Sequence, residues 1–340
     1  MSLRRRAKGW WRALRVPFEW LGIGLGVLLL SSLPRRGMLG LCDIASRVMY
    51  RFDRAGRRLA LFNLRVVRGA AEVRTLPFAL LKITRLAPPT KREEKILRRS
   101  YRNMARTIGH AFWTCRNARR RVAAAGEMCA EGKRFLAANR PAVTVSGHIG
   151  CWEILSQLAF LEGHPMMSVA KDIGTVGMTR LLMRSRMSIG QEIVHAEGAF
   201  RPLMQGIKDG KSLGLLVDQV VKPKNGGVWV RFFGRPVPVS AAPAFFAAKG
   251  KAPVVVAWSR PLPDGRYRCE VVSTYSAQEA RDVWGLTQRC LHDLEGVIRR
   301  HPSCWVLNYR YFRKVPTAEE LAQLSAREGE KKFPLPKKAK

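Results

Sequence analysis

The stretch from Val143 to Glu153 constrains the fold more than any other part of the chain. It reads Val-Thr-Val-Ser-Gly-His-Ile-Gly-Cys-Trp-Glu, so an apolar β-branched run stops at a glycine and a histidine follows at once. This order is typical of a strand that turns into a helix, with His148 in the turn. Functional sites of α/β sheets lie outside the carboxyl ends of the strands, which is where this turn falls.

His148 and Glu153 are the first candidate catalytic pair. A histidine can take and return a proton near neutral pH, and a carboxylate at its far ring nitrogen would fix the tautomer. On one continuous helix the two side chains would point roughly 140° apart. They converge only if His148 lies in the turn and Glu153 in the first turns of the helix. Such a pair also occurs by chance, so the rest of the chain has to support the hypothesis. Cys151 offers a thiol nucleophile as an alternative, although we expect it to pack under the turn.

The charge of the chain is extreme. Its 61 Lys and Arg residues against 25 Asp and Glu residues give a formal net charge of +36, and 47% of the residues are apolar. A disordered basic arm would be less apolar, so a folded protein that meets a polyanion is indicated. The polyanion could be nucleic acid, an anionic membrane surface or an acidic protein. Seven cysteines without a CxxC pair indicate free thiols, and no His/Cys cluster has the spacing of a zinc site. We therefore expect no metal and no cofactor.

The N-terminal region combines basic residues with an apolar run over 20–33. The run is short for a bilayer crossing, which needs roughly 17–25 residues. No small-residue cleavage site follows it, so we predict an uncleaved membrane anchor, either a tilted helix or one lying in the interface. A buried core helix is the alternative. We expect the main domain to lie on the cytoplasmic face of the membrane.

The periodicity of the chain changes near residue 140. Before that point we expect helices, with a long helix that begins at the capping box Thr90-Lys91-Arg92-Glu93. After it, apolar runs that predict strands alternate with helical patterns. The strands are expected at 142–146, 213–217, 228–232, 254–258 and 267–272. The helices are expected at 151–161, 179–189, 200–208, 242–250 and 282–301. This alternation predicts an α/β fold with a mixed, mainly parallel sheet flanked by helices.

The chain resembles the His-x4-Asp/Glu acyltransferases and, more narrowly, the lauroyl/myristoyl transferases of lipid A biosynthesis. Beside the His148–Glu153 block, four further blocks occur in the family's order. These are Arg186-x3-Gly190, the strand end Asp218-Gln219, the segment Phe232-Phe233-Gly234-Arg235-Pro236, and Pro302-x-x-Trp305 followed by Arg310 and Arg313. Lys171 lies where the family has a basic-Asn-Pro segment. We expect a membrane-associated region over 1–55, a helical region over 56–125 and a basic, partly disordered tail over 316–340. The resemblance implies that residues 126–315 form the acyltransferase core and that the protein lies at a bacterial inner membrane.

The resemblance also implies a reaction and the roles of the site residues. An acyl chain would pass from acyl-carrier protein, or from acyl-CoA, to a hydroxyl of an anionic membrane glycolipid, a lipid A precursor. His148 would be the general base and Glu153 would hold its tautomer, while Arg186 would bind an acceptor phosphate or the tetrahedral oxyanion. Asp218 could orient a basic partner. The remaining candidates for substrate binding are Gln219, Lys171, Phe233, Gly234 and Arg310.

Two alternatives stay open on the sequence. The same scaffold could acylate another anionic lipid, such as a phosphatidylinositol mannoside or a lysophospholipid. A basic nucleic-acid-binding membrane protein without catalysis is an alternative of another class. That alternative would require a docking motif or basic clusters interleaved with aromatic residues, and the chain shows neither. We therefore expect no nucleic-acid partner.

Overall fold

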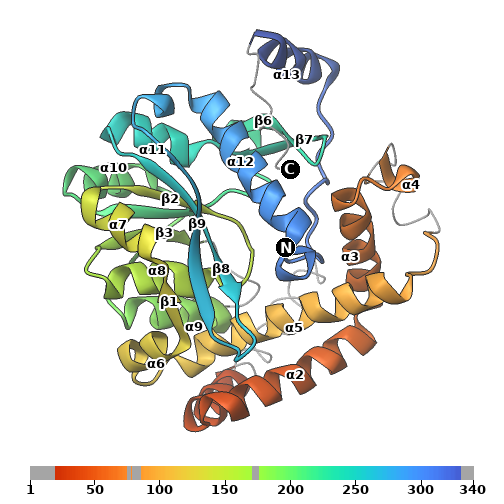
Figure 1. Ribbon diagram of the computed structural model, residues 1–340, viewed down its shortest axis with the longest axis vertical. Helices are drawn as coiled ribbons and strands as arrows, with labels where there is room; N and C mark the ends of the chain where they lie inside the picture. Colours follow the sequence, from red (N-terminus) through yellow and green to blue (C-terminus); the bar gives the residue numbers. More distant parts are fainter. Residues whose placement is uncertain (1–19, 75–77, 79–85, 171–175, 331–340) are drawn as a thin grey trace, which may run out of the picture.

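A seven-stranded sheet forms the centre of the computed structural model, which describes residues 20–74, 78, 86–170 and 176–330 (Figure 1). Its strand order is β1-β9-β8-β2-β5-β3-β4. Neighbouring strands are parallel except for the antiparallel pair β8 and β9. The strands are β1 (Gly126–Met128), β2 (Val143–Ser146), β3 (Met166–Ala170), β4 (Glu192–His195), β5 (Ser212–Leu216), β8 (Val254–Pro261) and β9 (Tyr267–Tyr275). The predicted α/β class with a mixed, mainly parallel sheet is confirmed.

Helices cover both faces of this sheet, because its strands carry apolar side chains on both sides. Alternate residues of β8 show this, since Val254 and Val256 belong to one hydrophobic core whereas Val255 and Ala257 belong to the other. The first core is shared with α10 (Phe200–Lys208), α11 (Ala242–Gly250) and α12 (Val283–Arg300), and the second with α6 (Ala118–Ala125), α7 (Ala130–Ala138) and α8 (Trp152–Leu161). A further helix, α9 (Val176–Met187), precedes β4.

The helical region before the sheet is built around α5 (Lys91–Trp113). The predicted capping box is present, since Thr90 accepts from the main-chain N–H of Glu93 and Glu93 accepts from that of Thr90. Glu93 also binds buried Arg65 through two hydrogen bonds of 3.0 and 3.1 Å. This ion pair ties α5 to α3 (Arg54–Val67), while α2 (Arg35–Phe52) packs along α5 and the short α4 (Ala71–Arg74) follows α3.

A helix over 20–32 precedes α2 and exposes apolar side chains. Within the described residues, no helix is both long enough and apolar enough to cross a membrane. The prediction of a membrane-associated N-terminal region therefore stays a prediction, and residues 1–19 lie outside the described part of the chain.

A separate hairpin and a C-terminal helix complete the second half of the chain. The strand predicted at 228–232 is present as β6 (Gly227–Phe232), but it pairs with β7 (Arg235–Ser240) in a separate antiparallel hairpin. The tail, predicted to be partly disordered, forms the helix α13 (Ala318–Glu330), in which Leu324 is buried. Glu328 of that helix pairs with Arg231 of β6 at 2.9 Å, so α13 is held on the hairpin. Residues 331–340 lie outside the described part.

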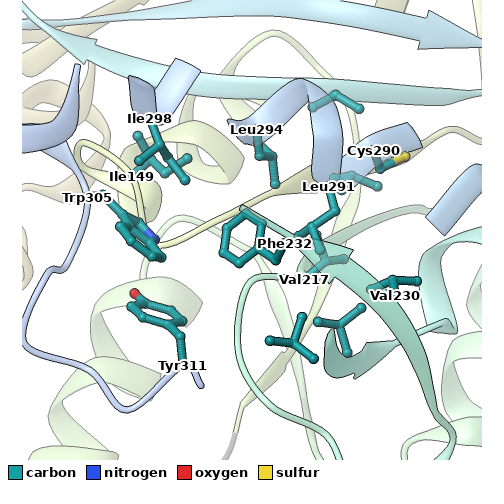
Figure 2. Packing of buried hydrophobic residues seen from close by; sticks show 14 of the residues in the cluster. Ile149, Val217, Val230, Phe232, Cys290, Leu291, Leu294, Ile298, Trp305 and Tyr311 are labelled. Carbon is teal, nitrogen blue, oxygen red and sulfur yellow. The ribbon is translucent and has the colours of Figure 1, made fainter. Parts of the chain in front are cut away.

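Aromatic side chains join the hairpin to the loop that follows α12 (Figure 2). The ring of Trp305 stacks on Tyr311 at 4.1 Å and meets Phe232 edge-on at 5.6 Å. Ile149, the residue after His148, is fully buried in this same core and forms a β-bridge with Trp305. The packing therefore fixes the turn that carries His148.

Candidate active site

The strand register brings His148 beside Asp218. In the parallel pair of β2 and β5, Ser146 lies opposite Leu216. His148 and Asp218 each follow two residues later, so both leave the sheet at the same level of neighbouring strands. The Nδ1 atom of His148 is 2.7 Å from Oδ1 of Asp218, and the main-chain N–H of His148 donates to Oδ2 at 2.9 Å.

Glycine makes the turn after β2 possible. Gly150 has a φ of 65°, and a Cβ there would lie 1.8 Å from the main-chain oxygen of Ser259. Its N–H donates to the oxygen of Cys304, and the oxygen of His148 accepts from Val306, so the turn is clamped by the segment after α12. The predicted glycine-bracketed turn is confirmed.

Asp218 is buried and ionised. Burial alone would raise the pKa of its carboxyl, but the charge and hydrogen bonds of His148 and a hydrogen bond of 3.0 Å from Trp305 Nε1 lower the net pKa. The carboxylate therefore accepts from three donors. With Nδ1 donating to Asp218, the free lone pair of His148 lies on Nε2.

The Nε2 atom of His148 faces the half-buried side of the site. It lies 3.2 Å from the amide nitrogen of Gln219, which donates to it, and the ring packs edge-on against Trp152 at 4.9 Å. The imidazole keeps 19% of its surface exposed, so a small group can reach Nε2 by displacing the amide. A histidine held by a carboxylate on one nitrogen and accessible at the other is the arrangement of a general base.

Glu153 does not hold the tautomer of His148, and that prediction is wrong. Its carboxylate lies under the first turn of α8, where Arg186 of α9 donates to it twice at 2.7 Å and Trp152 once at 3.0 Å. Burial alone would raise the pKa of Glu153, but Arg186 outweighs it and the net pKa is lowered. The pair therefore joins α8 to α9 beneath the site.

Arg186 is correspondingly engaged and keeps only 14% of its side chain exposed. Burial alone would lower its pKa, but Glu153 raises it, so the guanidinium stays charged. Arg186 donates to Glu153 through Nε and Nη2, and its predicted contact with an acceptor phosphate or an oxyanion stays a prediction.

The fully buried thiol of Cys151 does not support the alternative nucleophile. Burial raises its pKa to about 12, so it stays protonated near neutral pH. Nearby His110 is also buried and hydrogen-bonds to Gln157, and burial lowers its pKa to about 4. These two groups are structural.

Comparison with known proteins identifies the chain. A model of the family described as bacterial lipid A biosynthesis acyltransferase matches residues 83–314, which is more than half of the chain. The chain belongs to this family. It is similar among solved structures to the 1-acyl-sn-glycerophosphate (LPA) acyltransferase PlsC from Thermotoga maritima, with 13% identity, a TM-score of 0.31, and coverage of 70% of this chain and 95% of that one. No curated protein matched the chain.

Membership of the lipid A acyltransferase family makes this protein an acyltransferase. The predicted enzyme class is confirmed, and the alternative of a protein without catalysis is wrong. The lipid A acyltransferase match begins before α5 and ends after Trp305, so it includes both members of the His148–Asp218 pair.

Two of the other predicted site residues, Phe233 and Gly234, lie in the turn between β6 and β7. Phe233 is buried against Trp305 at 5.7 Å between ring centres, and Gly234 forms the exposed hairpin turn with a φ of 76°. Phe233 therefore packs in the core and Gly234 forms a turn, and the prediction that they bind substrate stays a prediction. Arg310 is exposed, and Lys171 lies outside the described part of the chain.

Trp305 is the site residue whose role the sequence did not reveal. Its indole N–H donates to Asp218, and its ring carries the aromatic packing of Figure 2. The Pro302-x-x-Trp305 block marks the position, but nothing in its spacing indicates a hydrogen bond to a residue 87 positions earlier.

Proposed function

We propose that this acyltransferase moves a fatty acyl chain from the thioester of acyl-carrier protein to a hydroxyl of a lipid A precursor, with His148 as the general base. The observation that carries the proposal is the 2.7 Å contact between Nδ1 of His148 and ionised Asp218, which leaves Nε2 as the proton acceptor. Family membership supports the lipid A acceptor, and the positive charge of the chain supports anionic substrates.

The reaction needs one proton to move in each direction. Nε2 of His148 takes the proton of the acceptor hydroxyl while the oxygen attacks the thioester carbonyl. The tetrahedral intermediate then collapses, the C–S bond breaks, and the leaving sulfur takes the proton back from Nε2. Asp218 stabilises the imidazolium between the two steps. The ester and the free thiol are the products, and no covalent enzyme intermediate is required.

Without substrate, Gln219 makes the hydrogen bond to His148 that the acceptor hydroxyl makes in the reaction. Its amide nitrogen lies 3.2 Å from Nε2 of His148, at the place where the acceptor hydroxyl has to arrive. The incoming hydroxyl replaces this hydrogen bond, and the released amide becomes a donor for the substrate. Among the predicted cations, exposed Arg310 is a candidate for an acceptor phosphate.

We also propose that the enzyme lies on the cytoplasmic face of a bacterial inner membrane. The helix over 20–32 exposes Leu21, Leu25 and Leu28, and α2 exposes Ile44 and Phe52. Within each helix these residues are three, four or eight positions apart, so each set lies on one helix face. Apolar faces of this kind on a strongly basic protein fit the surface of an anionic bilayer.

The test is acyl transfer by the purified protein in mixed micelles. Labelled acyl-carrier protein and acyl-CoA are compared as donors, with a lipid A precursor and a lysophospholipid as acceptors. We expect the precursor to gain the mass of one acyl chain with acyl-carrier protein, and His148→Ala to give no product. Transfer to the lysophospholipid alone would contradict the lipid A acceptor, while preference for acyl-CoA would contradict the donor.

A further inference from the structure

A basic groove lies between α3, the first turns of α5 and the carboxyl end of α12. Its volume is about 660 Å³, and six of its lining residues carry a positive charge, namely Arg68, Arg92, Lys95, Arg99, Arg299 and Arg300. Of the described residues that line it, none is Asp or Glu. Three chain segments that are far apart in sequence therefore place cations around one concave surface, which we call the basic groove.

The charges of the basic groove are not neutralised from within the described chain. Arg299 is the exception, since it donates to the oxygen of Val67 at 2.6 Å and lies 3.6 Å from Glu295. The other five cations have no carboxylate partner among the described residues. Three arginines elsewhere in the helical region do have carboxylate partners, in the pairs Arg65–Glu93, Arg98–Glu94 and Arg106–Asp43. The pKa of His301 in the groove wall is lowered by burial and by the charge of Arg300.

One backbone segment links the wall of the groove to the turn that carries His148. It includes Ser303, whose oxygen accepts from Asn103 of α5 at 2.8 Å. The next residue, Cys304, accepts from Gly150, and Val306 donates to His148 through the main chain. One short backbone segment therefore forms part of the groove and also clamps the catalytic turn.

The groove does not belong to the apolar surface of the N-terminal helices. In Figure 1, α5 lies between α2 and the carboxyl end of α12, where the 3-10 helix η4 (Pro302–Cys304) begins. The exposed apolar residues Ile44, Val48 and Phe52 are on α2, whereas Arg92, Lys95 and Arg99 recur along the groove side of α5. The groove is therefore a surface separate from the proposed bilayer contact.

We propose that the basic groove is the docking surface for the acidic acyl-carrier protein, which delivers its thioester to His148. This inference rests on the proposed function for the identity of the donor. A concave surface with six cations and no lining carboxylate complements an acidic partner. Such complementarity raises the rate of encounter and fixes the orientation of the partner, and salt weakens it.

The test compares two variants with equal changes of net charge. In the groove variant, Arg92→Glu, Lys95→Glu and Arg99→Glu reverse three exposed charges of the groove. In the control variant, Arg201→Glu, Lys208→Glu and Lys249→Glu reverse three exposed charges on α10 and α11. Binding of holo acyl-carrier protein is measured by fluorescence anisotropy at low and high salt. Initial rates are measured with acyl-carrier protein and with a small acyl-pantetheine thioester, and thermal unfolding checks that both variants are folded.

For the groove variant, we expect the Kd and the KM for acyl-carrier protein to rise at least about 30-fold. Both constants should also depend much less on salt than those of the wild type. The rate of the groove variant with acyl-pantetheine and the behaviour of the control variant should stay within about threefold of the wild type. Equal binding of the carrier protein by the groove variant and the wild type would overturn the proposal. An equal loss of rate with acyl-pantetheine would also overturn it. So would a groove variant that loses binding to anionic vesicles and still binds the carrier protein.

The experiment separates this proposal from the proposed function. If the wild type transfers acyl chains from acyl-pantetheine but neither binds nor uses acyl-carrier protein, the donor assignment and the docking surface both fail while the general-base mechanism stands. If His148→Ala keeps its activity with acyl-pantetheine, the mechanism fails whatever the groove variant shows.

Discussion

Replacing Asp218 with asparagine should invert the tautomer of His148 while the shape of the site is kept. Oδ2 of Asp218 accepts from two obligate donors, the main-chain N–H of His148 at 2.9 Å and Trp305 Nε1 at 3.0 Å. Oδ1 meets only Nδ1 of His148, at 2.7 Å. The asparagine must place its oxygen at the Oδ2 position, so its NH2 group faces Nδ1. Nδ1 then has to accept, and the ring proton moves to Nε2, where it blocks proton abstraction.

We expect a large fall in the rate of acyl transfer, because the imidazole is present but carries its proton on Nε2, the nitrogen that has to accept one. We expect kcat to fall about 10³- to 10⁴-fold, which corresponds to about 4 to 5.5 kcal/mol in the activation barrier. The KM for the acyl donor should change little, since Asp218 is buried and does not face substrate. Initial rates at saturating donor concentration measure the effect, and thermal unfolding and circular dichroism show whether the variant is folded.

The matched control is Asp293→Asn, which changes a half-buried aspartate of α12 that accepts from Tyr275 at 2.6 Å and also from Ser273. Its kcat should stay within about threefold of the wild type. A folded Asp218→Asn variant that keeps more than about a tenth of the wild-type kcat would refute the tautomer argument.

Three further predictions concern the structure that supports the site. Glu153→Gln should lower the free energy of unfolding by about 3–5 kcal/mol because it leaves the charge of buried Arg186 unpaired. In urea unfolding, the double variant with Arg186→Met should recover most of that lost stability, and no recovery would contradict an ion-pair origin. Glu93 has a pKa lowered from 4.5 to about 2 by hydrogen bonds from its arginine partner on α3. The protein should therefore lose up to about 3 kcal/mol of stability as the pH falls from about 4.5 towards 2, and an acid unfolding curve that Glu93→Gln leaves unchanged would refute this. Gly150→Ala should abolish activity and lower the Tm, because its Cβ would lie 1.8 Å from a main-chain oxygen and the backbone has a φ of 65°; wild-type Tm and activity would show that the turn relaxes.

Local patterns were sufficient to predict the elements that carry strong local signals. The capping box at Thr90 fixed the start of α5 within one residue, because a cap is a property of four consecutive residues. The buried strands β2, β5 and β8 were predicted from apolar β-branched runs. Strands β1, β3, β4 and β7 were not predicted. β4 (Glu192–His195) is a half-exposed edge strand whose polar ends give no period-two signal.

The sequence identified His148 but paired it with Glu153. It predicted that Asp218 could orient a basic partner, without showing that this partner is His148. Glu153 is near in sequence, and a local pattern favours such a pairing. Asp218 is 70 positions away, and only the adjacency and register of β2 and β5 bring it to His148. Strand order depends on tertiary packing, which single-sequence patterns do not contain. The same reason explains why the donor role of Trp305 was missed.

The central claim is that His148 is the general base of an acyl transfer to a membrane glycolipid. The most direct measurement is mass spectrometry of the glycolipid from a host that lacks its own late acyltransferases and expresses either the wild type or His148→Gln. We expect the wild type to add one acyl chain and the variant, present in the membrane at the same level, to add none. An equal gain from both proteins would contradict the account, because it would remove His148 from the mechanism.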